Sequence, residues 1–351
     1  MALLARTVMT PLHVEIRSGA VRNLGRVLAD GRISPEGRVV VLVGPVSGRR
    51  LLDRACRDLG GADVVTVHEA SVTEATRIVD ELRERSYDAV VGLGGGRTID
   101  VAKWVATRRG LPMVVAATTL SHDGLASPVS VLEDDGHRHS HGVHIPIAVL
   151  VDLDVVREAP PELIRSGIGD VVSNLSAIAD WRLAHDVRSE PVDGLAVNMA
   201  LTAAEAVIGR ADGVDCADFL ETLANGLVLS GLAMAIAGTS RPCSGACHEI
   251  SHALDQLRPG TGSHGSQVAL GALFATFLRG DKVTADRLAD CLRRHGLPLR
   301  PADLGLPAEQ FASAVAAAPS TRPGRFTVLE HLSLGEQELL ERVHDFETAY
   351  P

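Results

Sequence analysis

The chain is poor in the residues that mark several classes of protein. Among its 351 residues are only five cysteines, an odd number without a CxxC pair, so neither a disulfide framework nor a thiolate zinc site is indicated. Aromatic residues make up only 3%, and lysine is scarce. No run of lysine and arginine appears, and the formal net charge is −10. Because phosphate backbones bind to concentrated basic surfaces, we expect no nucleic-acid partner.

Long apolar runs are also missing. No uninterrupted apolar stretch approaches the roughly 20 residues that cross a bilayer, so we expect no membrane insertion. The first residues lack a clear signal-peptide core and cleavage site. The economical prediction is a cytoplasmic protein.

The order of predicted elements divides the chain into two halves. Apolar or alternating segments predict strands over 12–17, 39–43, 63–67, 88–92, 113–117 and 146–151, with a hairpin turn at 134–136. Helical patterns separate them, after 44–48, over 72–85 and over 98–108. After residue 152 a 3.6-residue period predicts helices over 161–185, 191–210, 215–238, 244–257, 265–279, 284–295, 307–317 and 335–348.

This order predicts two domains. Strands that alternate with helices are typical of a parallel sheet covered by helices, so we expect an α/β nucleotide-binding domain over 1–155. The remainder, 156–351, is predicted to be an all-α domain. A cleft between the domains is the default place for a ligand, and the large apolar helical surfaces favour a homo-oligomer.

A glycine loop follows the fourth predicted strand. Gly94, Gly95 and Gly96 lead directly into a helix, and Asp100 falls in its first turn. Backbone N–H groups of such a loop can approach a diphosphate, and a helix N-terminus adds partial positive charge. Neither the GxGxxG nor the GK[ST] fingerprint is present, and a tight turn alone would also use glycine.

A polar loop follows the fifth predicted strand. It reads Thr118-Thr119-Leu120-Ser121-His122-Asp123 and continues to Ser127. Ligand contacts in α/β folds gather at the carboxyl ends of strands, so this loop is predicted to meet a polyol or a cofactor amide. Turn and cap chemistry would explain Ser121 and Asp123 equally well.

Three histidines cluster between residues 244 and 267. His248 and His252 lie four residues apart on one helix face, and a Pro/Gly-rich turn can return His264 beside them. One interpretation is the HExxH zinc-protease pattern, with Glu249 as general base, although the longer signature would need glycine and histidine where Asp255 and Arg258 stand.

A second interpretation takes the metal ligands from two parts of the chain. His248 and His264 would then be ligands, and a carboxylate from elsewhere would be the third. His252 would support a ligand from behind or relay a proton. Asp170 is the candidate, because it lies in an apolar periodic stretch where an unpaired carboxylate would be costly and a metal ion would remove that cost. A helix cap at Asp170 and ordinary polar histidines are the plain alternatives.

Six motifs in order resemble one family. GGGRTIDVAK, SHDGLASP, GIGDVVSNLSAIADWRLAH, SGACHEISHALD, HGSQVALG and GRFTVLEHL are similar to those of the sn-glycerol-1-phosphate dehydrogenases, within the iron- or zinc-dependent alcohol dehydrogenases and dehydroquinate synthases. The resemblance covers nearly the whole chain. It implies a cytoplasmic oxidoreductase of phospholipid metabolism that uses NAD or NADP and a metal, expected to be zinc, with iron or nickel as alternatives.

The resemblance also implies roles for individual residues. Metal ligands would be Asp170, His248 and His264, and Asp123 would be a catalytic residue that contacts the substrate. From its position beside His248 we expect His252 to be the second catalytic residue, as a proton relay. The cofactor would contact Gly94, Gly95, Gly96, Thr98, Asp100, Thr118, Thr119 and Ser127. Two neutral imidazoles and one carboxylate leave an open position on a tetrahedral zinc, as catalytic sites require. There the metal would polarise the C2 carbonyl of dihydroxyacetone phosphate.

Three departures from the family pattern bear on the substrate. Family members usually carry acidic residues where this chain has Cys247 and Ser266, and the segment HGVHIPIAVLVD lacks the lysine expected before its proline. An anionic substrate should meet a lysine or arginine. The alternatives are therefore an unphosphorylated polyol substrate, a sugar-phosphate cyclase of the dehydroquinate synthase type, and a non-catalytic relative that binds nucleotide without metal.

Overall fold

The computed structural model describes residues 9–45, 51, 52, 59 and 61–351. Within it the chain forms two compact units. One contains residues 1–119, 124–159 and 234–238, and the other contains 120–123, 160–233 and 239–351. The predicted helix after residues 44–48 lies largely outside the described residues.

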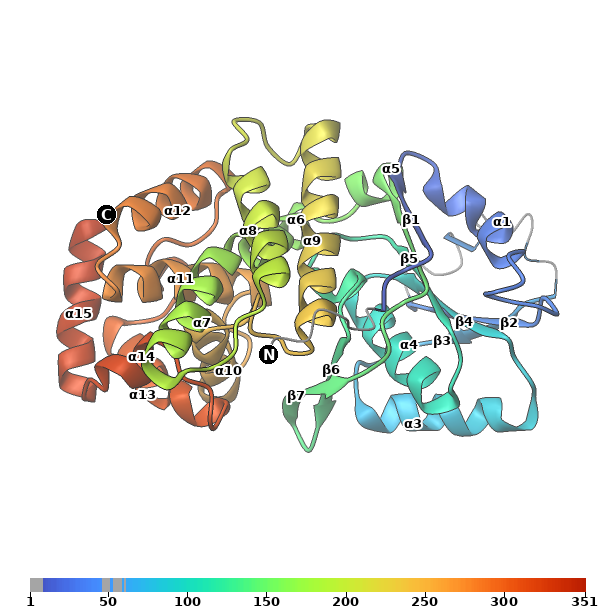
Figure 1. The fold of residues 1–351 in the computed structure, drawn as a ribbon, viewed down its shortest axis with the longest axis horizontal. Coiled ribbons are helices and arrows are strands. Elements are labelled where there is room, and N and C mark those ends of the chain that lie inside the picture. Colours follow the sequence, from blue (N-terminus) through green and yellow to red (C-terminus); the bar gives the residue numbers. More distant parts are fainter. Residues whose placement is uncertain (1–8, 46–50, 53–58, 60) are drawn as a thin grey trace. The chain divides into compact units, whose positions relative to one another are not determined.

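The first unit is built on a six-stranded parallel sheet with the strand order β1-β8-β5-β4-β2-β3 (Figure 1). The strands are β1 (His13–Arg17), β2 (Val39–Val43), β3 (Asp63–Thr66), β4 (Ala89–Gly94), β5 (Met113–Ala117) and β8 (Ala148–Asp152). An antiparallel hairpin of β6 (Val129–Asp134) and β7 (His137–Gly142) lies outside this sheet. All six predicted strands and the hairpin are confirmed, with ends shifted by up to two residues.

The strands are apolar along their whole length because helices cover both faces of the sheet. Val39, Val41 and Val43 join the core beneath α1 (Leu24–Leu28) and the 3₁₀ turn Ala20–Asn23. The alternate residues Val40 and Leu42 are equally buried and point to the other face. There α4 (Gly96–Arg109) and α3 (Val72–Glu81) pack, while α5 (Leu153–Arg157) follows β8 (Figure 1).

The strand order creates a switch point between β2 and β4. From β2 the chain moves outward to β3, and from β4 it moves to β5 on the opposite side. Ligands of open α/β sheets bind outside the carboxyl ends of strands at such a point. The turn after β4 holds the glycine loop, and a Cβ on Gly44, just after β2, would lie 3.3 Å from Thr98 Oγ1. The two turns therefore meet at Thr98.

The second unit is helical, as predicted. Its helices are α6 (Pro161–Val172), α7 (Asn174–Arg188), α8 (Gly194–Ile208), α9 (Ala217–Ala237), α10 (Ala246–Leu257), α11 (His264–Leu278), α12 (Lys282–His295), α13 (Ala308–Thr321), α14 (Val328–Leu332) and α15 (Glu336–Ala349). The single helix predicted over 161–185 is two helices. They separate at Ser173, whose hydroxyl donates to the carbonyl of Asp170 (2.8 Å).

Helix α9 is more apolar than the sequence analysis allowed. Its 21 residues have a mean hydropathy of 1.6 over an 18-residue window, and within the described part of the chain it is the one helix long and apolar enough to cross a membrane. Most of that window is buried inside the protein. Phe219, Leu223 and Leu227 are fully buried, as in a core helix.

Glycines bring α6 against two other segments of this unit. A Cβ on Gly167 would lie 1.9 Å from the carbonyl oxygen of Leu120, and a Cβ on Gly169 would lie 2.1 Å from that of Gly265. A Cβ on Gly265 would in turn lie 1.8 Å from the carbonyl oxygen of Ser166. No side chain fits these contacts, so the helices approach at backbone distance and place Asp170 beside the start of α11.

We therefore predict that Gly265→Ala separates α6 from α11. The added methyl group collides with backbone rather than with a flexible side chain, and the expected cost is at least about 2 kcal/mol of unfolding free energy. The melting temperature and the bound zinc, measured by elemental analysis, should both fall. Gly194→Ala is the matched control, because no atom lies within 4 Å of its Cβ position. An unchanged zinc content in Gly265→Ala would contradict the prediction.

Candidate active site

Three side chains of the helical unit converge as predicted. Asp170 comes from α6, His248 from the first turn of α10 and His264 from the first position of α11. Asp170 Oδ1 lies 3.6 Å from His248 Nε2 and 3.8 Å from His264 Nε2, and the three ligand atoms lie within 4.8 Å of one another. Zinc bonds of 2.0–2.1 Å set neighbouring ligand atoms roughly 3.3 Å apart in a tetrahedron, so the spacing suits a small metal ion.

The tautomer of His264 follows from its other ring nitrogen. Ser251 Oγ donates to Gln267 Oε1 (2.7 Å), so the same oxygen, 3.3 Å from His264 Nδ1, can only accept there. The amide of Gln267 is held in turn by Asp255 Oδ1 (3.0 Å) and Thr261 O (2.8 Å). His264 therefore carries its proton on Nδ1, and the lone pair of Nε2 faces Asp170.

His248 has a sulfur partner in the corresponding place. Cys247 Sγ lies 3.4 Å from His248 Nδ1, within the range of a hydrogen bond to sulfur. The Cys247 side chain is fully buried. Metal-binding histidines generally give their second N–H to an outer acceptor, which fixes the ring for the metal. Here the outer partners of the two histidines, Cys247 and Ser251, lie one turn apart on α10 and neither is a carboxylate.

The electrostatics of the cluster call for a cation. Burial raises the pKa of Asp170, but the hydrogen bond from His248, the charges of both histidines and the Asp123 amide outweigh it and lower that pKa to about 2. Burial lowers the pKa of His248, but Cys247 and Asp170 outweigh it and raise that pKa to about 10. Without a metal, a proton on His248 therefore supplies the positive charge beside Asp170. Metal binding to a histidine displaces such a proton. The donor set fits a divalent metal.

The zinc-protease interpretation does not match the geometry. His252 lies outside the ligand cluster of the described residues, with its ring 6.5 Å from that of His248. Glu249 is fully buried, and its Oε2 lies 3.1 Å from Thr327 Oγ1. Burial is the main cause that raises its pKa to about 8, and the nearby carboxylates of Glu330 and Asp180 add to it. The glutamate belongs to a buried structural network and does not approach the metal ligands.

Asp123 joins the site through its backbone. Its N–H donates to Asp170 Oδ2 at 2.8 Å, which leaves Oδ1 for the histidines. Residues 120–123 belong to the helical unit although they follow a strand of the sheet unit. Gly167 admits the carbonyl of Leu120 at this point, so the same glycine packing that positions Asp170 also positions Asp123.

The glycine loop forms a tight turn from β4 to α4. Gly94 ends the strand and Gly96 begins the helix. A Cβ on Gly94 would lie 2.8 Å from Thr98, and one on Gly95 would lie 3.0 Å from Thr119 Oγ1. Because a side chain would not fit at these distances, the turn alone requires glycine at positions 94 and 95. Thr119 Oγ1 is buried and has no hydrogen-bond partner among the described residues, so it is available to a ligand.

Lys103, part of the motif GGGRTIDVAK, is a residue of the site that the sequence did not predict. Its side chain is fully buried, and Nζ lies 3.4 Å from both the carbonyl and hydroxyl oxygens of Ser127 and also contacts the carbonyl of Val129. Asp100 Oδ1 lies 3.5 Å from the same ammonium. The predicted cofactor residues Asp100 and Ser127 are therefore linked by one buried cation. The sequence did carry a signal for this buried cation, because Lys103 is flanked by apolar residues in a predicted helix.

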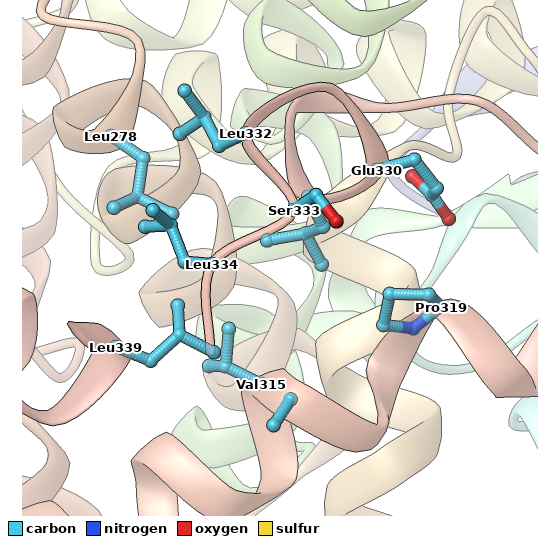
Figure 2. Close-up of a pocket in the computed structure, with 10 residues that line it drawn as sticks. Leu278, Val315, Pro319, Glu330, Leu332, Ser333, Leu334 and Leu339 are labelled. Atoms are coloured by element: carbon cyan, nitrogen blue, oxygen red, sulfur yellow. The ribbon is translucent and has the colours of Figure 1, made fainter. Parts of the chain in front are cut away.

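A separate pocket of about 280 Å³ lies in the helical unit (Figure 2). Leucines from α11, α14, α15 and the segment before α15 surround it, with Pro319 of α13 and Glu330 at its edge. None of the predicted site residues lines it. The pocket is thus distinct from the metal cluster.

Comparison with known proteins agrees with this architecture. Residues 15–160 match the family described as iron-containing alcohol dehydrogenase. A protein of Archaeoglobus fulgidus named glycerol-1-phosphate dehydrogenase, with NAD(P)+ in its name, is 36% identical over 345 residues, which cover 95% of this chain and 96% of the relative. The protein of the same name from Hyperthermus butylicus is 38% identical, covering 91% and 92%.

Solved structures share the fold over the whole chain. A probable glycerol dehydrogenase from Sinorhizobium meliloti has a TM-score of 0.79 at 25% identity and covers 99% of both chains. The glycerol dehydrogenase of Schizosaccharomyces pombe has a TM-score of 0.78 at 19% identity, which shows the fold alone. The chain belongs to the iron-containing alcohol dehydrogenase family. Within that family its curated relatives are the glycerol-1-phosphate dehydrogenases.

We predict that Ser251→Ala weakens metal binding. Loss of the acceptor frees His264 to rotate and to change tautomer, and loss of such outer partners typically costs 10–100-fold in metal affinity. Competition with a chromophoric zinc chelator measures the change. Ser266→Ala is the matched control, because its hydroxyl bonds Ser263 rather than His264. Equal affinities of the two variants would show that Ser251 does not orient the ligand.

Removal of the buried charge of Lys103 should weaken nucleotide binding and stability together. Lys103→Met leaves Asp100 beside apolar atoms and removes the donor to Ser127, with an expected loss of about 3 kcal/mol of unfolding free energy. Denaturant unfolding measures stability, and quenching of NAD(P)H fluorescence measures binding. The double variant Lys103→Met, Asp100→Asn should recover part of the stability. If nucleotide affinity stays at the wild-type value, the link to Ser127 has no role in binding.

Proposed function

We propose that this chain is a metal-dependent NAD(P)H oxidoreductase that reduces dihydroxyacetone phosphate to sn-glycerol 1-phosphate. The observation that carries the proposal is the convergence of two imidazole Nε2 atoms on the buried carboxylate of Asp170. The relatives named glycerol-1-phosphate dehydrogenase, 36–38% identical over more than nine-tenths of the chain, support the substrate.

Asp170, His248 and His264 would hold the metal, expected to be zinc, with iron or nickel as alternatives. When bound, the metal polarises the substrate carbonyl and the nucleotide supplies the hydride. The role of the protein is to hold the three metal ligands in a fixed arrangement. Ser251 and Cys247 fix the two rings, and the Asp123 amide fixes the carboxylate.

His252 lies beside the ligands as a neutral donor. Burial, followed by the charge of Arg322, lowers its pKa to about 2, so it stays uncharged. Arg322 Nε donates to His252 Nδ1 (3.4 Å), so the ring proton must sit on Nε2. We propose that this N–H donates a hydrogen bond to the substrate oxygen on which negative charge develops. The proton that completes the alcohol then comes from water.

Two related activities compete with this proposal. A polyol dehydrogenase would act on an unphosphorylated substrate, as the name of the Sinorhizobium meliloti structure suggests for that protein. A sugar-phosphate cyclase would use the same cofactors but would need several lysines and arginines around its substrate, and lysine is scarce here. The relatives favour the dehydrogenase with a phosphorylated substrate.

The remaining attributes extend the same proposal. We propose a cytoplasmic homo-oligomer that takes part in phospholipid metabolism. The nucleotide would lie at the β2–β4 switch point and contact the predicted residues of the turn after β4. Either NAD or NADP is compatible, because the relatives carry NAD(P)+ in their name.

Oxidation of NADH and NADPH tests the proposal directly. The zinc-loaded enzyme should reduce dihydroxyacetone phosphate, and His264→Ala should lower kcat/KM by at least about 10³-fold because the ligand set is broken. His344→Ala, an exposed histidine of α15, is the matched control and should retain wild-type activity. Chelation of the metal should abolish turnover, and added zinc should restore it.

Other outcomes select the alternatives. Turnover of dihydroxyacetone without its phosphate would identify a polyol dehydrogenase. No turnover of either ketone by zinc-loaded protein would reject both dehydrogenases and favour the cyclase.

A further inference from the structure

A tract of histidines in the sheet unit has no part in the proposed function. Four of the 14 histidines of the chain fall within residues 137–144. Three of them, His137, His139 and His141, alternate with other residues along β7 (Figure 1). Short histidine-rich tracts are typical of metal binding, because neutral imidazole is the commonest metal ligand in proteins. Their spacing decides whether the rings can act together.

The alternation places the three rings on one face of the hairpin. Successive side chains of a strand point to opposite faces, so residues two and four positions apart share a face. The register of β7 on β6 is set by the two-residue turn of Asp135 and Gly136, whose φ angles of 49° and 78° are typical of a type I′ hairpin. The three histidines therefore form one row, and Arg138 and Ser140 point to the other face.

The paired residues of β6 share this face and anchor it. The cross-strand pairs are Asp134–His137, Leu132–His139 and Ser130–His141. Leu132 and Ser130 are buried, and Ser130 Oγ donates to the carbonyl of Asp100 in α4 (2.8 Å). On β7, by contrast, His137 and His139 are exposed. The backbone of the row is thus held by the packing of β6, while its rings can be reached from solvent.

Two neighbouring histidines of the row can chelate one ion. Their Cα atoms lie about 6.6 Å apart, twice the rise per strand residue, and exposed rings turn about two side-chain torsions. By leaning toward each other, the rings bring one nitrogen each to a shared ion. Among the described residues the one group of three ligand atoms within 4.8 Å of one another is that of Asp170, His248 and His264. Binding at β7 therefore starts from a pair and requires the rings to rotate.

Two further features of the row favour a cation. The Nε2 atom of His141 is buried and has no hydrogen-bond partner among the described residues. Because a buried polar atom without a partner is unfavourable, this ring gains from a rotation that gives the nitrogen a ligand. At the other end, Asp134 lies directly opposite His137 and is exposed, so its carboxylate can add an oxygen ligand and offset the charge of the ion.

We propose that β7 carries a second metal site, in which His139 and one or both of its neighbours, His137 and His141, bind a divalent transition-metal ion. Imidazole suits copper, nickel and zinc, and copper should bind most tightly. His139 belongs to both possible pairs, whereas His137 and His141 lie about 13 Å apart along the strand, too far to chelate without it. The site shares no residue with the three ligands of the helical unit, so the chain binds a second ion.

Calorimetric titration of the untagged His264→Ala protein with Ni²⁺ tests the site, because this background lacks one ligand of the helical cluster. A Ni²⁺ ion should bind at β7 in this background. Addition of His139→Gln should weaken binding about 100-fold, because each remaining histidine then acts alone. His137→Gln or His141→Gln leaves one pair and should weaken binding less than about tenfold. With Cu²⁺ as the probe, electron paramagnetic resonance should show splitting from at least two nitrogens, and from at most one after His139→Gln.

His144→Gln is the matched control, because His144 is exposed but lies beyond the end of β7. It should bind Ni²⁺ as the parent does. Equal losses in the three β7 variants would indicate independent surface histidines, and unchanged binding after His139→Gln would place the ion elsewhere; either overturns the inference. Absence of Ni²⁺ binding to the His264→Ala parent would overturn it as well, even if a β7 variant did not fold. None of these measurements depends on turnover, so the proposed function is tested separately.

Discussion

The metal site depends on the close approach of two helix backbones. Helix α6 can place a buried carboxylate beside the first residue of α11 only because Gly169 and Gly265 have no side chains to hold the helices apart. The carboxylate is then enclosed, with one oxygen bound to the Asp123 amide and the other facing the Nε2 atoms of two imidazoles. A buried arrangement of acceptors without a cation is unfavourable, so the packing itself creates affinity for a metal ion or a proton.

A second buried carboxylate fixes the frame around this site. Asp180 of α7 is fully buried and accepts from the N–H of Ala246 at the start of α10 (2.8 Å) and from that of Val328 at the start of α14 (2.9 Å). Arg279, at the end of α11, supplies the countercharge at 2.7 Å. This ion pair therefore helps to position both helices that carry the converging histidines, and its satisfied hydrogen bonds compensate for the burial of charge.

The helical unit and the sheet unit hold their candidate site residues by different kinds of contact. The helical unit holds its candidate ligand rings through Cys247 and Ser251, neither of which is a carboxylate. The sheet unit instead uses a charged group. The buried ammonium of Lys103 contacts the carbonyl and the hydroxyl oxygens of the loop at Ser127. The departure at Cys247 changes the outer partner of His248, whereas the three converging side chains are all present.

The sequence by itself determined the alternation of strands and helices and the helical second half, and it singled out Asp170, His248 and His264, which the structure brings together. These follow from periodicity and from chemistry-bearing residues in recognisable motifs, which are local properties of the chain. Only the tertiary structure decided which nitrogen of each histidine faces the carboxylate, because that depends on Ser251 and on a hydrogen bond to Gln267 sixteen residues away. It also decided that Glu249 points to Thr327 and that Arg322 meets His252, seventy residues earlier. Such contacts join residues distant in sequence, where neither periodicity nor spacing carries a signal.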